Sequence, residues 1–183
     1  MIFTQNIQRA IEFAEQVHRD QMRKGKKMAY IEHPLAVGLI LARAGAEEEI
    51  VIAGILHDTI EDSDGRITKQ DIEQEFGSRV AEMVSDVTEQ DKSLPWEERK
   101  RLAREHVAEM SKDSLLVKSG DVVHNLTEIG IDLEREGGKI FERFNAPKEQ
   151  QLEVYTKLVG AIASAWHENP LLQDLRAALE RLR

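Results

Sequence analysis

Four side chains in this sequence are of the types that bind a divalent metal ion, and each lies beside an apolar segment. His57 and Asp58 directly follow the apolar run Ile50 to Leu56. His33 opens a second apolar segment, and Asp121 lies within a third, LLVKSGDVVHNL. Because burying an unpaired carboxylate is costly, these acids need a compensating partner. Two imidazoles and two carboxylates suit a borderline first-row divalent metal better than calcium, and they leave room for water in an octahedral shell.

Each member of this set also has an ordinary structural interpretation. An adjacent His-Asp pair is common by chance, and His57 could simply end a helix, where the dipole favours it, with solvated acids beyond. His33 could be a packing or capping residue. Asp121 could pair with Lys118, one turn before it. No single member is specific for metal, but the set of four, in this order and on helices, predicts a metal centre.

Two further acids, Glu61 and Asp62, follow closely. If the helix continues through them, its spacing puts Glu61 one turn beyond His57 and Asp62 one turn beyond Asp58. His57 and Asp58 are then about 100° apart around the helix axis, close enough for both to reach one ion. We therefore expect the helix that contains the apolar run to carry the segment HDTIED at its end.

The segment HRDQMRKGKKMAYIEH holds five cations, among them Arg23 and Lys24, against two acids. Its composition fits a solvated connection between two helices. In an acidic protein, it also fits a local site that admits a phosphorylated ligand. Asn125, one turn after Asp121 on the same helical face, could donate or accept a ligand hydrogen bond.

Helical apolar spacing extends over almost the whole chain, and no run of period-two alternation predicts a sheet. The first helix has Thr4 available as N-cap, and the second runs from Pro34 to Gly45. The third, which contains the apolar run, is apolar on nearly all sides and belongs at the centre of the core. Thr68 opens a short fourth helix with a capping box. Further helices are expected at about 78–89, 95–111, 114–135, 147–167 and 170–182.

The length of 183 residues fits a single all-α domain, with a metal and catalytic core over about 4–135 and C-terminal helices over about 147–182. The absence of cysteine excludes a disulfide scaffold, a thiolate metal site and a cysteine nucleophile. A net charge of −9 argues against a non-specific binder of nucleic acid or anionic membranes. No apolar run approaches the ~18 residues of a membrane span, and charges interrupt the N-terminal segment where a signal peptide would be apolar. We expect a cytoplasmic protein; the sequence does not indicate its oligomeric state.

The H…HD…D pattern resembles the signature of HD-superfamily metal-dependent phosphohydrolases. The segments FAEQVHRDQMRKG, AYIEHPLAVGLIL, AGILHDTIEDSD and LLVKSGDVVHNL are more closely similar to the hydrolase domain of RelA/SpoT proteins and their small stand-alone relatives. Those proteins cleave guanosine tetra- and pentaphosphate alarmones. Within this resemblance HDTIED is specific, because the general HD signature lacks the second acidic pair. The resemblance implies an all-α helical bundle of the HD type that holds one Mn²⁺ ion.

The same resemblance implies a role for ten residues. It implies four metal ligands, which are His33, His57, Asp58 and Asp121. Glu61 and Asp62 match the acidic pair that positions or activates the attacking water. The residues that match positions beside the nucleotide are Arg23, Lys24, Asn125 and Tyr155. The implied partner is therefore a phosphorylated nucleotide, a small molecule.

Three positions depart from the family pattern. Val122 stands where many relatives have lysine, and Thr127 stands where many have arginine. Both differences are expected to remove positive charge beside the phosphate site, which bears on substrate specificity. Ala29 replaces a common proline before Tyr30, a milder change. The length leaves no space for the synthetase domain of the bifunctional proteins, so a hydrolytic role is expected.

The leading hypothesis is a metal-dependent hydrolase that converts guanosine 3′,5′-bis(pyrophosphate) alarmones to pyrophosphate and GDP or GTP. One alternative is an HD phosphohydrolase for another nucleotide or phosphate ester. A second alternative is a non-catalytic regulator that binds a nucleotide through the same cleft. The acidic pair Glu61 and Asp62 counts against a mere binder, because such a protein has no use for two acids that face an anionic ligand.

Overall fold

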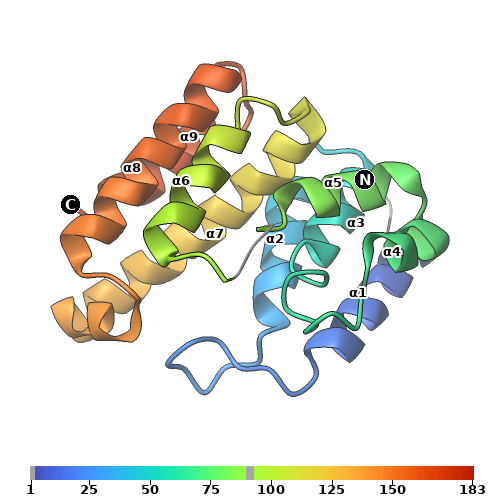
Figure 1. Cartoon of the computed structure of the whole chain (residues 1–183), viewed down its shortest axis with the longest axis horizontal. Coiled ribbons are helices and arrows are strands. Elements are labelled where there is room, and N and C mark those ends of the chain that lie inside the picture. The colour runs from blue at the N-terminus through green and yellow to red at the C-terminus, as the bar shows by residue number, and fades with distance from the viewer. Residues whose placement is uncertain (1–2, 90–92) are drawn as a thin grey trace.

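The computed structural model describes residues 3–89 and 93–183, and these residues form helices joined by turns (Figure 1). Within these two ranges no strand occurs, and the one β-bridge joins Met22 and Ala29. The predicted all-α, HD-type fold is confirmed. The α-helices are α1 Gln5–His18, α2 Glu32–Arg43, α3 Glu48–Leu56, α4 Lys69–Phe76, α5 Ser78–Val87, α6 Trp96–His106, α7 Lys112–Glu136, α8 Lys148–Ala165 and α9 Leu172–Glu180. The 3₁₀ helix η1, Gly137–Arg143, follows α7.

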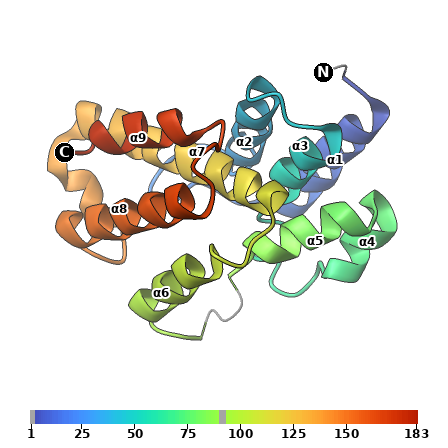
Figure 2. The same ribbon diagram turned by 90° about the horizontal axis from the view of Figure 1, so that it is seen from above.

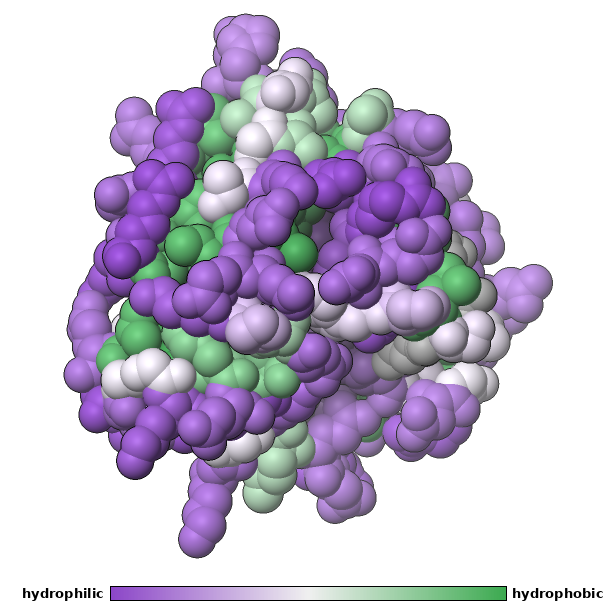
Figure 3. All heavy atoms as spheres, turned by 60° about the vertical axis from the view of Figure 1, so that its left-hand side comes forward, coloured by the Kyte–Doolittle hydropathy of each residue, from purple (hydrophilic) through white to green (hydrophobic). Residues whose placement is uncertain are grey.

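The long helix α7 contacts two groups of helices. On one side it packs against α2, α3 and α5, and α3 also contacts α1. On the other side it packs against α9, which contacts α8, and Figure 2 shows these two helices away from α1–α5. The division into a core over about 4–135 and C-terminal helices over about 147–182 stays a prediction. On the face drawn in Figure 3, hydrophilic side chains surround smaller apolar patches.

Helix α3 lies at the centre of the core, as its sequence predicts. Every residue from Ile50 to Leu56 is buried. The expectation that this helix carries HDTIED is wrong, because α3 ends at Leu56 and turns follow. Side chains donate hydrogen bonds to backbone carbonyl oxygens near the end of α3. The Thr59 hydroxyl donates to Leu56 O over 2.6 Å, and the His57 ring donates from Nδ1 to Gly54 O over 2.8 Å. Such local hydrogen bonds compete with continuation of a helix.

Hydrogen bonds from nearby side chains also cap the ends of other helices. The Thr4 side chain caps α1, and Thr68 and Asp71 form the predicted capping box of α4. Helix α6 stops at His106 instead of continuing to about 111, and Ser111 caps α7 by accepting the N–H of Ser114. The 3₁₀ helix after α7 was not predicted.

Three glycines let α2, α3 and α7, the helices that carry or adjoin His33, His57 and Asp121, approach one another closely. A Cβ atom on Gly54 would lie 2.2 Å from Leu41 Cδ1, and one on Gly38 would lie 2.7 Å from Ile55 Cγ1. A Cβ on Gly120 would lie 3.2 Å from Leu41. Because protein cores are close-packed, a methyl group at Gly38 or Gly54 would overlap its neighbour, and one at Gly120 would require Leu41 to shift by a few tenths of an ångström. The close approach sets how far apart the ends of the three helices lie.

Gly54→Ala is expected to lower the free energy of unfolding by about 1–3 kcal/mol, because the added methyl group overlaps the fully buried Leu41. Gly160→Ala in α8 is the matched control, since nothing lies within 4 Å of its added methyl group. Alanine is there expected to raise the stability by up to about 1 kcal/mol through helix propensity. Urea unfolding followed by circular dichroism measures both. Equal effects of the two substitutions would contradict the packing argument.

Candidate metal centre and adjoining cleft

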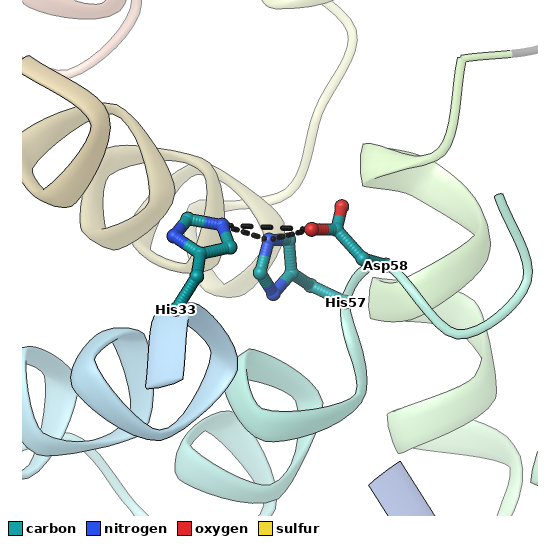
Figure 4. A group of neighbouring side chains, drawn as sticks. All are labelled: His33, His57 and Asp58. Atoms are coloured by element: carbon teal, nitrogen blue, oxygen red, sulfur yellow. Dashed lines mark hydrogen bonds and ion pairs between the residues drawn. The ribbon is translucent and has the colours of Figure 1, made fainter. Parts of the chain in front are cut away.

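The structure brings His33, His57, Asp58 and Asp121 together at the ends of α2 and α3 and in the middle of α7. The Nε2 atoms of His33 and His57 are 3.1 Å apart. Asp58 Oδ2 lies 3.1 Å from His57 Nε2 and 3.5 Å from His33 Nε2 (Figure 4). Asp121 Oδ1 lies 3.4 Å from His33 Nε2 and 3.8 Å from His57 Nε2. Four ligand atoms from three separate elements thus face one small volume.

The donor set fits a divalent metal ion. The Nδ1–H of His57 donates to the carbonyl of Gly54, which leaves the lone pair of its Nε2 directed at the cluster. His33 Nδ1 contacts His124 Nδ1 at 2.8 Å, so His33 can likewise direct Nε2 inward. Outer hydrogen bonds of this kind fix the tautomer of metal-binding histidines. His33, His57 and Asp58 by themselves present ligand atoms within 4.8 Å of one another.

When no metal ion is bound, a proton on a neighbouring side chain must compensate the negative charge of the buried carboxylates. Burial lowers the pKa of His33. Burial also opposes protonation of His57, but the charges of Asp58 and Asp121 outweigh it and raise the pKa of His57 to about 9. Although burial disfavours both carboxylates, His57 holds the pKa of Asp58 below its usual range, and Lys118 and His33 do so for Asp121. The acids are therefore ionised, which is the form that binds a cation.

Side chains other than the four predicted metal ligands hold the carboxylates in place. The Tyr30 hydroxyl donates to Asp58 Oδ2 over 2.6 Å, and Lys118 donates to Asp121 Oδ2 over 2.9 Å. The amide of Asn125 donates to Asp121 Oδ1 over 2.5 Å. Pairing of Asp121 with Lys118, the ordinary alternative, therefore coexists with its place in the cluster. Tyr30 and His124 were not predicted, because their partners are remote in sequence.

The acidic pair lies in the turns that follow α3, outside the helix. Glu61 is half-buried, and its Oε2 accepts the N–H of Glu89 at 3.1 Å. Burial, together with the charge of Asp58, raises the pKa of Glu61. The N–H of Asp62 donates to Asp58 O, and the Asp62 carbonyl accepts from Gln21 Nε2 at 2.7 Å. The turn that carries the pair is thus fastened beside the cluster.

A cavity of about 270 Å³ adjoins the metal centre. All four residues predicted to contact a nucleotide line it: Arg23, Lys24, Asn125 and Tyr155. Tyr30 and Asn125 join the two sites, because each lines the cavity and also bonds to a carboxylate of the cluster. Phe144 and the two tyrosines supply aromatic surface, against which a base can stack. We call this cavity the cleft.

The cleft contains four cations and two acids. The cations are Arg23, Lys24, Lys26 and Arg143, and the acids are Glu128 and Asp132. Arg23 Nη2 donates to Asn125 Oδ1 at 2.9 Å, and Lys24 Nζ donates to the exposed Asn145 at 2.8 Å. Burial raises the pKa of Tyr155 to about 12, so its hydroxyl stays protonated and can donate. The two acids were not predicted, because nothing in their local sequence sets them apart from solvated ones.

The departures from the family pattern lie outside the cleft. Val122 is 2% exposed and belongs to the hydrophobic core. The Thr127 hydroxyl donates to the Val123 carbonyl over 2.7 Å, and neither Thr127 nor Ala29 is among the lining residues. The expectation that Val122 and Thr127 remove positive charge beside the phosphate site stays a prediction.

Comparisons with known proteins agree with this geometry. A profile of the HD domain matches residues 10–158. The guanosine-3′,5′-bis(diphosphate) 3′-pyrophosphohydrolase MESH1 of Xenopus tropicalis is 42% identical over 123 residues, 66% of this chain and 67% of the relative. A guanosine-3′,5′-bis(diphosphate) 3′-pyrophosphohydrolase of Aquifex aeolicus is 34% identical over 172 residues, 93% of this chain but 23% of the longer relative. The structure of a metazoan orthologue of SpoT, described as hydrolysing ppGpp, superimposes with a TM-score of 0.80 at 28% identity, covering 99% of this chain and 97% of that one.

The helical bundle and its cluster of histidines and aspartates define a metal-dependent hydrolase. The chain belongs to the HD domain family. Membership implies a divalent metal, and the ligand geometry described above fits one. Among the described residues, no helix combines the length and the apolar character that crossing a membrane requires.

The ion pairs of Glu128 with Arg23 and Lys26 predict that the stability of the protein falls at acid pH. Although burial opposes ionisation, Arg23 and Lys26 lower the pKa of Glu128 from 4.5 to about 2. This corresponds to roughly 3 kcal/mol of stability, present above about pH 4.5 and lost as the pH falls through 2. Urea unfolding at pH 7 is expected to show wild type more stable than Glu128→Gln, with the difference shrinking toward pH 2. A difference that stays constant with pH would contradict the assigned ion pairs.

Proposed function

We propose that this chain is a Mn²⁺-dependent hydrolase that converts guanosine 3′,5′-bis(pyrophosphate) or its pentaphosphate analogue to pyrophosphate and GDP or GTP. The observation that carries the proposal is the cluster of two imidazoles and two carboxylates beside a cleft with cations and aromatic rings. The names of the relatives support the substrate class. The resemblance to RelA/SpoT hydrolase domains supports manganese. A cytoplasmic location, which fits a chain without cysteine, is part of the proposal.

His33, His57, Asp58 and Asp121 are the residues that would hold the metal ion. When bound, the ion supplies Lewis-acid polarisation of the phosphoryl group and lowers the pKa of water. The chain keeps these ligands oriented through Tyr30, Lys118 and His124, which leaves little freedom to the side chains that contact the ion.

Glu61 is the proposed general base. Burial raises the pKa of this carboxylate, and a base whose pKa lies nearer the operating pH transfers protons more effectively. In the proposed step the water loses a proton to Glu61, its oxygen bonds to the phosphorus next to the 3′ oxygen, and the bond from that phosphorus to the 3′ oxygen breaks. The leaving oxygen then takes up a proton. Asp62, whose carbonyl and N–H are held by Gln21 and Asp58, is proposed to orient the water.

Arg23, Lys24 and Asn125 are proposed to bind the phosphates and ribose, with Tyr155 beside the nucleotide. Cations placed before the reaction stabilise the charge that develops on the phosphate oxygens without reorganising at that moment. The aromatic rings of the cleft offer stacking surface to the base.

Asp58→Asn is expected to abolish metal-dependent release of pyrophosphate from guanosine tetraphosphate and to weaken Mn²⁺ binding at least tenfold, because it removes a charged ligand. Metal binding is measured by calorimetry, and products are separated by anion-exchange chromatography. Asp174→Asn is the matched control, since this acid pairs with Arg43 at the surface. Unchanged Mn²⁺ affinity in Asp58→Asn would contradict the ligand assignment.

Glu61→Gln is expected to lower kcat about 10²–10⁴-fold while leaving Mn²⁺ affinity close to that of wild type, because the residue acts on a proton and not on the ion. The decline of wild-type activity toward acid pH is expected to disappear in the variant. Glu73→Gln, an exposed glutamate of α4, provides the control. Loss of Mn²⁺ binding in Glu61→Gln would show that Glu61 is a ligand instead.

Product analysis separates the alternatives. Release of orthophosphate, or of a linear product from a cyclic nucleotide, would indicate an HD phosphohydrolase with another substrate. Nucleotide binding without turnover in the presence of Mn²⁺ would favour a non-catalytic regulator.

A further inference from the structure

At one end of the cleft, the cations Arg23 and Lys26 already pair with Glu128, an acid of the chain itself. Arg23 donates to Glu128 Oε2 through both Nε, at 3.0 Å, and Nη2. Lys26 Nζ donates to the other oxygen, Oε1, at 2.8 Å. The side chains of Arg23 and Glu128 are each 15% exposed, so the pair is largely shielded from water.

The Nε and Nη2 donors of Arg23 converge on one oxygen of Glu128, and a phosphate oxygen could accept hydrogen bonds from the same donors. Arg23 therefore cannot keep both donors on Glu128 and also give them to a ligand phosphate. We propose that Glu128 competes with the ligand for Arg23 and thereby sets how many negative charges the bound nucleotide carries at this end. The inference rests on the proposed function, because it concerns the ligand of the same cleft.

The neighbouring charges strengthen this competition. Lys26 also pairs with Asp132 Oδ2 at 2.7 Å, and Arg143 Nη1 lies 3.9 Å from the same oxygen. Three of the four cations of the cleft, Arg23, Lys26 and Arg143, are thus engaged by acids of α7. A ligand with an additional phosphate places more negative charge near Glu128, and like charges at close range repel. We therefore expect the wild-type cleft to bind diphosphates in preference to triphosphates.

Calorimetric titration of the metal-free protein with GDP and with GTP tests this directly. Neither probe contains a 3′-pyrophosphate, so binding is measured apart from turnover. In Glu128→Gln we expect GTP to bind about tenfold more tightly than in wild type and GDP about threefold more tightly. Glu134→Gln, on the same helix but paired with the exposed Arg181, is the matched control and is expected to leave both affinities unchanged.

Three results would overturn the proposal. Weaker binding of GTP to Glu128→Gln would show that Glu128 positions Arg23 for the ligand. Equal gains for GDP and GTP would show that Glu128 does not discriminate by charge. Absence of measurable binding to both proteins would show that removing this acid does not open the cleft to phosphate.

A second variant and a separate assay keep the test decisive. If Glu128→Gln does not fold, Glu128→Asp shortens the acid and loosens its contact with Arg23, so its GTP affinity is expected to exceed that of wild type; a lower affinity contradicts competition. Turnover of guanosine tetraphosphate by the wild type with Mn²⁺ is assayed in parallel. Tighter GTP binding by the variant without any wild-type turnover would uphold the competition and reject the proposed activity.

Discussion

Four groups with lone pairs face one another in a space from which water is largely removed, and this arrangement requires a cation. Two imidazole nitrogens lie 3.1 Å apart, and oxygens of Asp58 and Asp121 approach both. A proton shared within the cluster or a metal ion compensates the charge. The first turn of α2, the end of α3 and the middle of α7 must stay in register for the four groups to meet. The glycine contacts between these helices supply that register.

The end of α3 at Leu56 gives the site its shape. In a continuous helix, Glu61 and Asp62 would each lie one turn beyond His57 and Asp58 on the same face. In the observed turn, His57 Nε2 and Asp58 Oδ2 converge to 3.1 Å. The turn also frees Glu61 to lie against the N–H of Glu89. The consecutive residues His57 and Asp58 can thus bind one ion, while Glu61 and Asp62 are proposed to act on the attacking water.

Helical periodicity sufficed to predict the all-α fold, because each helix buries a repeating apolar face. It did not predict where α3 ends, since hydrogen bonds from Thr59 and His57 decide this. The four clustered residues could be proposed because an acid in an apolar segment needs a partner. Contacts such as Tyr30 with Asp58, or Arg23 with Glu128, depend on how remote segments pack. No local feature distinguishes Glu128 from the solvated glutamates around it.

Tyr30 makes the metal centre and the cleft parts of one thermodynamic system. Its hydroxyl donates to Asp58, its ring centroid lies 5.3 Å from the guanidinium carbon of Arg23, and the same ring also lies 4.8 Å from the buried ring of His18. Tyr30 is thus one side chain in contact with both Arg23 of the cleft and Asp58 of the metal centre. By linkage, whatever factor occupancy of one site applies to the affinity of the other must act equally in the opposite direction.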